Sequence, residues 1–274
     1  METTLSAVDF ERLERETEQL RAAFAAGDPI RHVTIEHMLR DEPARRAIAA
    51  FPTPERMAIA FAGLAEVKNA EERIERLDPI FQAIFSDLRS PRFLQWLEAL
   101  TGIRELRADP ELHGGGLHQG PDGSFLDIHA DFNLHPRLRI YRRLNVLIYL
   151  NPEWQERWGG CLELWAQDMS ERRAFIVPIA NRCVIMETHD HAYHGYKQLH
   201  LPPGVTRKSL ASYYYSPHRS ESQTEQEHNT LFQLRPEERA GSRTRQFLRR
   251  IEALAPRSTR PLVRIVRRIF GLSD

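Results

Sequence analysis

The sequence predicts an α+β protein in which a helical N-terminal region precedes an antiparallel β-sandwich or barrel. Three observations support this class. Residues 1–102 carry apolar side chains at helical spacing, with helix start and stop signals between them. Residues 103–216 hold roughly seven or eight short strand-like runs separated by turns. Of the 274 residues, 41% are apolar and 28% charged, which is an ordinary globular balance.

The N-terminal region, residues 1–102, is expected to support the sheet and to be mainly helical. Asp41 is a suitable N-cap, and Pro43 then falls in the first turn of the helix that follows. Ser90-Pro91 starts another helix and Thr101-Gly102 ends it. We therefore expect a short strand at 32–35, and helices at 10–26, 41–51, 72–88 and 92–100.

The predicted sheet occupies residues 103–216. Its turns are indicated by Gly114-Gly115-Gly116, Pro121-Asp122-Gly123 and Trp158-Gly159-Gly160. The strongest strand is RRLNVLIYLN, residues 142–151. It is followed by the strands CLELW (161–165), AFIVPI (174–179), CVIMET (183–188) and SLASYYYS (209–216). Residues 217–274 form a C-terminal extension that returns to helical patterning near Pro236.

Bulk composition points to no special partner. The formal net charge is zero, and the two cysteines, Cys161 and Cys183, cannot form a disulfide framework, so we read them as small core residues. The N-terminus METTLSAVDFERLERE is acidic and lacks the apolar run of a secretory signal. No stretch approaches the roughly 20 apolar residues of a membrane span. A reducing, cytoplasmic setting is expected.

A histidine and an aspartate stand two apart in LDIHADFN, residues 126–133. In a strand, residues two apart share a face, so His129 and Asp131 point the same way. A third ligand would complete one triangular face of an octahedron and leave three positions open. The segment THDHAYHGYKQL provides three choices, His189, His191 and His194. The competing interpretation of the HAD triplet is an ordinary polar face of a surface strand.

Further polar residues alternate along two other strands. Arg207 and Ser209 share one face of TRKSLASYYYS, and Asn145 and Tyr149 share one face of RRLNVLIYLN. An arginine suits the bidentate binding of a ligand carboxylate better than a lysine does. The alternatives are a surface salt bridge for Arg207 and a core tyrosine with a satisfied hydroxyl for Tyr149.

With these motifs in this order along the chain, residues 101–216 resemble the iron(II)- and 2-oxoglutarate-dependent oxygenases, specifically the prolyl-4-hydroxylase-like branch. The resemblance rests on TGI, the glycine-rich segment, HAD, RRLNVLIYLN-x-x-W with GG after it, HG and RKSL. It implies a double-stranded β-helix, also called a jelly-roll or cupin-like core, at residues 103–216, buttressed by the N-terminal helices. It implies Fe(II) as cofactor, with 2-oxoglutarate and O2 as co-substrates.

The resemblance also assigns residues. His129, Asp131 and His194 match the iron ligands, and His194 is preferred because Gly195 follows it. Arg207 matches the partner of the distal 2-oxoglutarate carboxylate, while Ser209 and Tyr149 match residues that assist it in some relatives. Asn145 and His118 are candidates for the substrate pocket, with a structural role as the alternative for each.

The implied reaction is hydroxylation of an unactivated C–H bond in an amino-acid-like or peptidyl, first of all prolyl, substrate, with release of succinate and CO2. Asp131 favours hydroxylation, since relatives that halogenate lack the carboxylate ligand. Desaturation, epimerisation and natural-product or sugar substrates stay open. So does a non-enzymatic metal-binding barrel acting as a sensor or scaffold, which would need no 2-oxoglutarate site.

The C-terminal residues 240–274 carry nine arginines against two acidic residues, a net charge of +7. Pro261 can start and Gly271 can end a basic amphipathic helix. Such a helix has the profile of an interfacial membrane anchor. The alternative is packing of its apolar stripe on the protein's own barrel or on a second subunit in a homo-oligomer. Nucleic acid is not expected, because no aromatic residues are interleaved with the charge.

Overall fold

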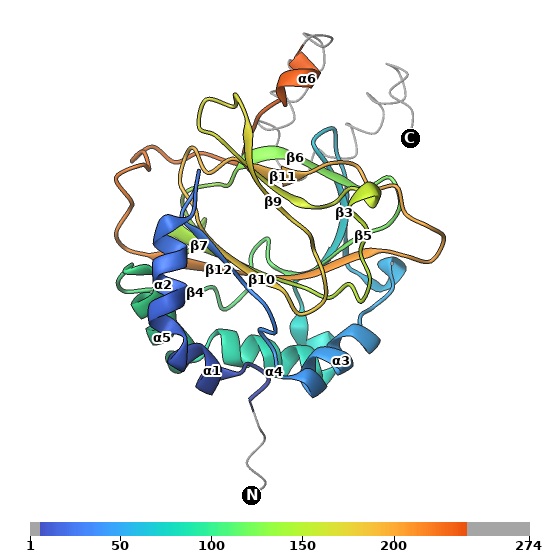
Figure 1. Cartoon of the computed structure of the whole chain (residues 1–274), viewed down its shortest axis with the longest axis horizontal. Coiled ribbons are helices and arrows are strands. Elements are labelled where there is room, and N and C mark those ends of the chain that lie inside the picture. Colours follow the sequence, from blue (N-terminus) through green and yellow to red (C-terminus); the bar gives the residue numbers. More distant parts are fainter. Residues whose placement is uncertain (1–5, 240–274) are drawn as a thin grey trace, which may run out of the picture.

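The computed structural model describes residues 6–239 and consists of one strongly curled antiparallel sheet with helices packed against one side (Figure 1). The predicted C-terminal basic helix lies outside the described residues. The sheet contains β1 His32–Ile35, β2 Ile59–Ala62, β3 Glu66–Glu71, β4 Arg107–Ala108, β5 Gly116–Gly120, β6 Phe125–Ala130, β7 Tyr141–Tyr149, β8 Leu162–Trp165, β9 Arg172–Ile176, β10 Cys183–Glu187, β11 His194–Tyr196, β12 Arg207–Ser216 and β13 Leu231–Phe232. The α-helices are α1 Phe10–Arg15, α2 Thr17–Ala26, α3 Asp41–Ala49, α4 Pro79–Leu88, α5 Pro91–Thr101 and α6 Pro236–Arg239. Short 3-10 turns lie at Pro54–Arg56, Ile74–Arg76 and Glu156–Trp158.

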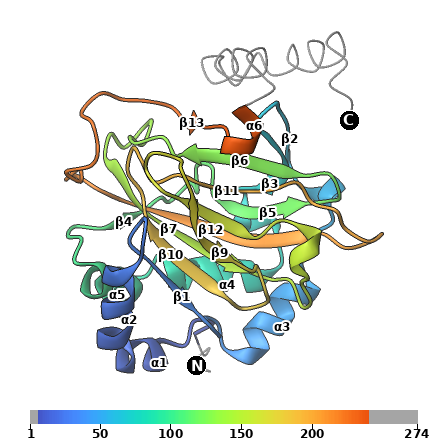
Figure 2. The ribbon, with the colours of Figure 1, turned by 45° about the horizontal axis from the view of Figure 1, so that its top comes forward.

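The predicted jelly-roll core is confirmed. Along the sheet the strands are ordered β1-β10-β7-β12-β5-β3-β6-β11-β8-β9, and β3 joins the two halves because it pairs with both β5 and β6. Figure 2 shows the half that contains β6 and β11 folded over the half that contains β7 and β12. A cavity between the two halves holds the site described below.

The main hydrophobic core lies between the helices and the outer face of β7, β10 and β12. Phe81 and Phe85 of α4 and Phe93 of α5 are completely buried there against Leu144 and Tyr214. The Phe93 and Tyr214 rings lie 5.9 Å apart. Burying aromatic side chains of this size is the main favourable term that fixes the helices to the sheet.

Helix α5 begins and ends as the sequence predicts. The Ser90 hydroxyl accepts a hydrogen bond from the Phe93 amide, which satisfies one free N–H of the first turn. Gly102 ends the helix with φ of +75°, in the left-handed region that favours glycine.

Other predicted boundaries were wrong by several residues. The helix expected from residue 72 starts at Pro79, where Asp78 caps the Ile80 amide, because proline fits the first turn but not the interior. The helix expected at 10–26 is divided at Glu16 into α1 and α2. Asp41 is the first helical residue, not the cap, and α3 ends at Ala49.

The N-terminal region also contributes to the sheet. The strand predicted at 32–35 is present and pairs with β10, from His32 opposite Met186 to Ile35 opposite Cys183. Strands β2 and β3, which the sequence analysis did not predict, form a hairpin at the rim of the cavity. No helix in the described part of the chain is long and apolar enough to cross a membrane.

Candidate metal centre

Three of the predicted site residues converge at one end of β6 and β11. The two strands are antiparallel, and His129 lies directly opposite His194, with Asp131 just beyond the end of β6. One ligand atom from each residue lies within 4.8 Å of the other two. The Asp131 carboxylate oxygens lie 3.6 Å from Nε2 of each histidine. His189 and His191, the alternatives left open by the sequence, belong to no such group among residues 6–239.

Both histidines are held in the form that binds a metal. His129 Nδ1 donates to the Asp127 carbonyl and His194 Nδ1 to the Ala192 carbonyl, each at 2.9 Å. With the proton on Nδ1, the Nε2 lone pair is left free to face the centre. Burial, and then the neighbouring His129, lower the pKa of His194 to about 4, so its imidazole is neutral near pH 7.

The carboxylate of Asp131 is fixed by two residues of β7. Asn145 Nδ2 donates to Oδ2 at 2.8 Å, and the Arg142 guanidinium lies 3.1 Å from the same oxygen. Burial alone would raise the pKa of Asp131, but Arg142 and the two histidines outweigh it and hold the pKa well below the usual value. Asp131 is therefore an anion oriented toward the two Nε2 atoms.

Arg142 is a site residue that the sequence analysis missed. Its side chain is only 2% exposed, and its guanidinium lies 3.6 Å from the Tyr213 ring centroid and 4.7 Å from that of Phe132. Nε and NH2 both donate to Oδ1 of Asn145. The arginine pair that opens the strong strand RRLNVLIYLN was the available signal, since a charge in a buried strand requires a partner. Asn145, predicted as a pocket residue, lines the cavity but has its amide engaged with Asp131 and Arg142.

A buried cation stands at the inner end of the same cavity. Arg207 is 7% exposed, and its Nε donates to the Gly160 carbonyl at 2.7 Å. Its guanidinium carbon lies 4.2 Å from the Tyr196 ring centroid and 5.0 Å from that of Tyr149. Among residues 6–239, no carboxylate forms an ion pair with Arg207. A buried charge without a partner is strongly unfavourable, so this end of the cavity is suited to an anion.

Tyr149 and Ser209 complete that end. Strand pairing places Ser209 opposite Tyr149 on the cavity face, as the alternation predicted. The fully buried Tyr149 hydroxyl makes no geometrically complete hydrogen bond within the described chain. Burial raises the pKa of Tyr149 and the nearby Arg207 opposes that rise, so the hydroxyl stays a neutral donor. Gly160, at φ of +70°, is required because a Cβ there would lie 3.0 Å from Cδ of Arg207 and 2.4 Å from Cδ2 of Leu199.

The cavity has a volume of about 800 Å³ and runs from Arg207 past the three ligands to the β2–β3 hairpin. His118 lies along it, with Nε2 donating to the Gly114 carbonyl at 3.1 Å. Burial, and then Lys68, lower the pKa of His118 to about 3. The structure therefore brings all eight site residues predicted from the sequence to one cavity: His118, His129, Asp131, Asn145, Tyr149, His194, Arg207 and Ser209.

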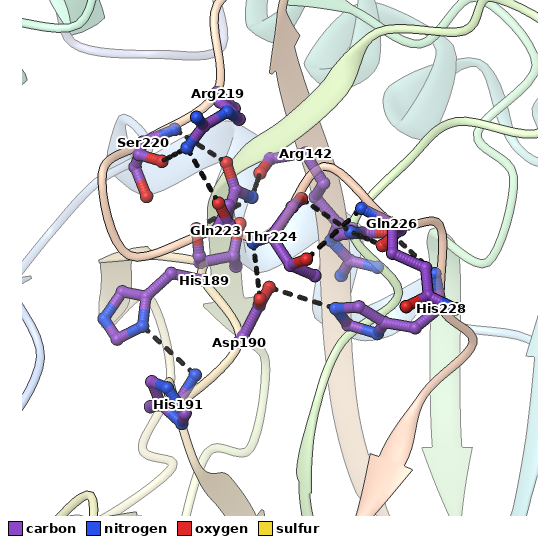
Figure 3. A network of polar contacts seen from close by, with 12 residues as sticks. Arg142, His189, Asp190, His191, Arg219, Ser220, Gln223, Thr224, Gln226 and His228 are labelled. Atoms are coloured by element: carbon purple, nitrogen blue, oxygen red, sulfur yellow. Dashed lines mark hydrogen bonds and ion pairs between the residues drawn. The ribbon is translucent and has the colours of Figure 1, made fainter.

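Residues 217–235, here called the strap, cross the outer end of the cavity and were not expected there. Phe232 pairs with His129 through β13, and its ring lies 5.6 Å from the imidazole. Asp190, in the loop before His194, accepts hydrogen bonds from the Thr224 amide at 2.6 Å and from His228 Nε2 at 3.0 Å (Figure 3). Gln223 donates to the Arg142 carbonyl at 2.6 Å. The strap thus joins both ligand-bearing segments.

Comparison with known proteins agrees with this geometry. Residues 115–215 match the family model described as the 2OG-Fe(II) oxygenase superfamily. A prolyl-4-hydroxylase from Pseudomonas putida has 19% identity and a TM-score of 0.51, with 72% of this chain and 99% of that chain covered. No curated protein sequence matches the chain significantly.

Two eukaryotic structures have the same fold. A prolyl hydroxylase from Trichoplax adhaerens was solved with a hypoxia inducible factor peptide. It has 15% identity and a TM-score of 0.53, with 79% of this chain and 96% of that chain covered. A prolyl 4-hydroxylase from Phytophthora capsici has 19% identity and a TM-score of 0.52, with 78% of this chain and 68% of that chain covered.

The matched core contains the His129-Asp131-His194 group, and its match to the 2OG-Fe(II) oxygenase superfamily supports a 2-oxoglutarate-dependent dioxygenase, a class of enzyme that uses Fe(II), 2-oxoglutarate and O2. The resemblance inferred from the sequence is confirmed. Within this class, the solved structures that share its fold include prolyl-4-hydroxylase-like enzymes.

Proposed function

We propose that this protein hydroxylates an unactivated C–H bond of an amino-acid-like or peptidyl substrate, and that a prolyl group is the first substrate to test. One observation carries the proposal. Two sites line the same cavity. One is the group of two imidazoles and one carboxylate, and the other is the buried Arg207, which has no carboxylate partner. The first suits a metal with open positions, and the second suits the far carboxylate of a bound 2-oxo acid.

The donor set fits iron(II). His129 and His194 offer neutral Nε2 atoms, and Asp131 offers an ionised carboxylate, so all three can bind without losing a proton. With 2-oxoglutarate, bound iron(II) supplies oxidative decarboxylation coupled to insertion of oxygen into a C–H bond. The chain's own residues then bind and orient the reactants and keep water away.

Arg207 and Tyr149 would bind the distal carboxylate of 2-oxoglutarate. The guanidinium supplies charge from between the Tyr149 and Tyr196 rings, and the Tyr149 hydroxyl supplies a donor without a competing partner. Ser209 lies next to Tyr149 across the strand pair and can add a third donor. The substrate would enter from the opposite end, between the β2–β3 hairpin and the strap, where the cavity reaches the surface.

Two findings support the choice of an amino-acid-like or peptidyl substrate. The fold is shared with enzymes named as prolyl hydroxylases, one of them solved with a peptide. The cavity is also lined by the Lys68–Glu66 ion pair of the hairpin and by Glu227 of the strap, which pairs with Arg139, and a polar lining of this kind suits a zwitterionic or peptide group.

The test is succinate release. Protein loaded with Fe(II) and 2-oxoglutarate is incubated in air with free proline, other amino acids and proline-containing peptides, and the products are identified by mass spectrometry. Succinate formation with a mass gain of 16 on one substrate is expected. A product that has lost two hydrogens, or an isomer of unchanged mass, would instead assign desaturation or epimerisation.

A non-enzymatic metal-binding scaffold is the other function weighed. It would not require a buried cation without a carboxylate partner in this cavity, which Arg207 provides. Binding of Fe(II) with no measurable affinity for 2-oxoglutarate would favour the scaffold.

A further inference from the structure

A second hollow lies on the opposite side of β7 from the metal centre. The pairing of β7 with β12 shifts register between Leu144 and Arg142, so regular alternation is interrupted there. Arg142 therefore lines the cavity together with Asn145, while Arg143 lines the outer hollow. The outward side chain enters a hollow of about 580 Å³ between α2, the end of α5 and the start of β1. Figure 1 shows α2 and α5 packed side by side next to this end of the sheet.

The hollow collects four guanidinium groups. Arg21 comes from α2, Arg31 from just before β1, Arg104 from just beyond α5, and Arg143 from β7. The walls between them are apolar and are formed mainly by Phe24, Leu100 and Ile103.

Within residues 6–239, Glu187 is the one carboxylate that forms ion pairs with the lining arginines. Arg31 Nε donates to Glu187 at 2.7 Å, and Arg143 NH2 lies 3.6 Å from the same carboxylate. The side chains of Arg21 and Arg104 are exposed and make no ion pair or hydrogen bond with the rest of residues 6–239. Two of the four charges are therefore left without an anion.

Arg143 is the buried member of the group. It is 7% exposed, and its NH1 donates to the His218 carbonyl at 2.6 Å, but its Nε has no hydrogen-bond partner in the described chain. An unsatisfied buried donor on a charged group costs more than an ordinary missing hydrogen bond. The Arg143 residue lines the hollow, so an anion bound there would lie beside this buried charge.

We propose that this hollow is a binding site for a small oxyanion, a phosphate or carboxylate group carried on a compact molecule, separate from the 2-oxoglutarate site. Guanidinium groups match both anions with paired N–H donors. The apolar walls lower the local dielectric, which strengthens the attraction, and they can contact the carbon part of an organic ligand.

The proposal is tested with inorganic phosphate and, in a separate arm, acetate, titrated calorimetrically into the whole protein. The same titrations are made on Arg207→Gln, which removes the charge of the catalytic cavity. Saturable binding that is equally tight in both proteins is expected. Tighter phosphate binding would identify a phosphate ligand, and tighter acetate binding a carboxylate.

The location is tested with the double variant Arg21→Gln/Arg104→Gln. These exposed residues can be replaced without disturbing Glu187, and at least a ten-fold loss of affinity is expected. The matched control is Arg76→Gln/Arg157→Gln, which removes two exposed arginines elsewhere, neither of them ion-paired in the described chain. It should change affinity less than two-fold. The proposal is overturned if neither anion binds saturably, if Arg207→Gln abolishes binding, or if both double variants weaken it equally.

Discussion

At the residue scale, the metal centre depends on the protonation and orientation of a few side chains. Each ligand histidine has its Nδ1 proton fixed by a backbone carbonyl two residues earlier in the chain, so the strand and loop themselves select the tautomer. Asp131 has its second oxygen held by Asn145 and Arg142. The ligands are thus oriented before a metal arrives, which reduces the cost of binding it.

The first prediction concerns the distal ligand. Anaerobic Fe(II) with 2-oxoglutarate should give a visible metal-to-ligand charge-transfer band, and His194→Ala should abolish it because Nε2 of His194 faces the other two ligands. His191→Ala is the matched control from the same loop and should retain the band. The opposite pattern would show that the distal ligand is misassigned.

The second prediction concerns the co-substrate anion. Arg207→Gln should raise the 2-oxoglutarate concentration needed for half-saturation by tens-fold or more, since losing one partner of a buried charge pair costs about 2–5 kcal/mol. Iron binding, measured separately by calorimetry, should survive. Lys208→Ala is the control, because Lys208 lies on the other face of β12 and does not line the cavity. Equal effects of the two replacements would contradict the assignment.

The third prediction concerns pH. Because the pKa of His118 is lowered to about 3 by burial, the unfolded chain takes up its proton at higher pH than the folded protein does. Its contribution to the free energy of unfolding of the metal-free protein should therefore fall as pH drops from about 6.5 toward 3, by about 1.4 kcal/mol per pH unit.

His118→Gln keeps a donor for the Gly114 carbonyl but cannot titrate. We measure the free energy of unfolding by chemical denaturation across this pH range. It should change less steeply with pH for the variant, by the amount that corresponds to about one proton. Identical slopes in the two proteins would mean that His118 is not protected from protonation.

At the element scale, the predictable parts are those specified by local chemistry. The α5 boundaries follow from Ser90 and Gly102, and β12 and β7 follow from long apolar runs whose alternation also placed Arg207, Ser209 and Tyr149 on cavity faces. Strands β2 and β3 were missed because IAFA and EVKNAE are short and weakly patterned, and their strand conformation depends on pairing with distant β5 and β6. Arg142 and the strap were missed for the same reason, since their roles arise from contacts far apart in sequence.

The fourth prediction concerns β13. Phe232→Ala should weaken Fe(II) binding by roughly 2- to 10-fold, because the ring contact that holds His129 is worth about 0.5–1.5 kcal/mol. Leu231→Ala is the control, since Leu231 is adjacent but 39% exposed. Iron titration of both variants checks this, and equal affinities would show that Phe232 does not position His129.

At the scale of the whole molecule, charge is unevenly distributed along the chain. Residues 240–274 carry +7 and the remainder −7, although the total is zero. By sequence, the chain therefore divides into an acidic part, residues 1–239, and a basic C-terminal extension, residues 240–274. The role of that extension remains a prediction from the sequence.

The fifth prediction tests the extension. In sedimentation with anionic vesicles, the full chain is compared with one that ends at Ala255. We favour packing of the apolar stripe on the protein itself or on a second copy, because one short amphipathic helix supplies little membrane affinity. The expected result is that neither form pellets and that truncation lowers stability or changes oligomeric state. Salt-sensitive pelleting of the full chain alone would establish membrane binding instead.

The strap has one more consequence, which concerns solubility. One edge of β6 is paired with β3 at Phe125 and Leu126, and with β13 at His129 and Ala130. Without β13, the end of β6 that carries the ligands would present unpaired backbone N–H and C=O groups beside apolar side chains. Such an exposed edge is a template for intermolecular strand addition. The strap therefore also protects the sheet against aggregation, and a chain cut before residue 230 should precipitate more readily, whether or not iron is bound.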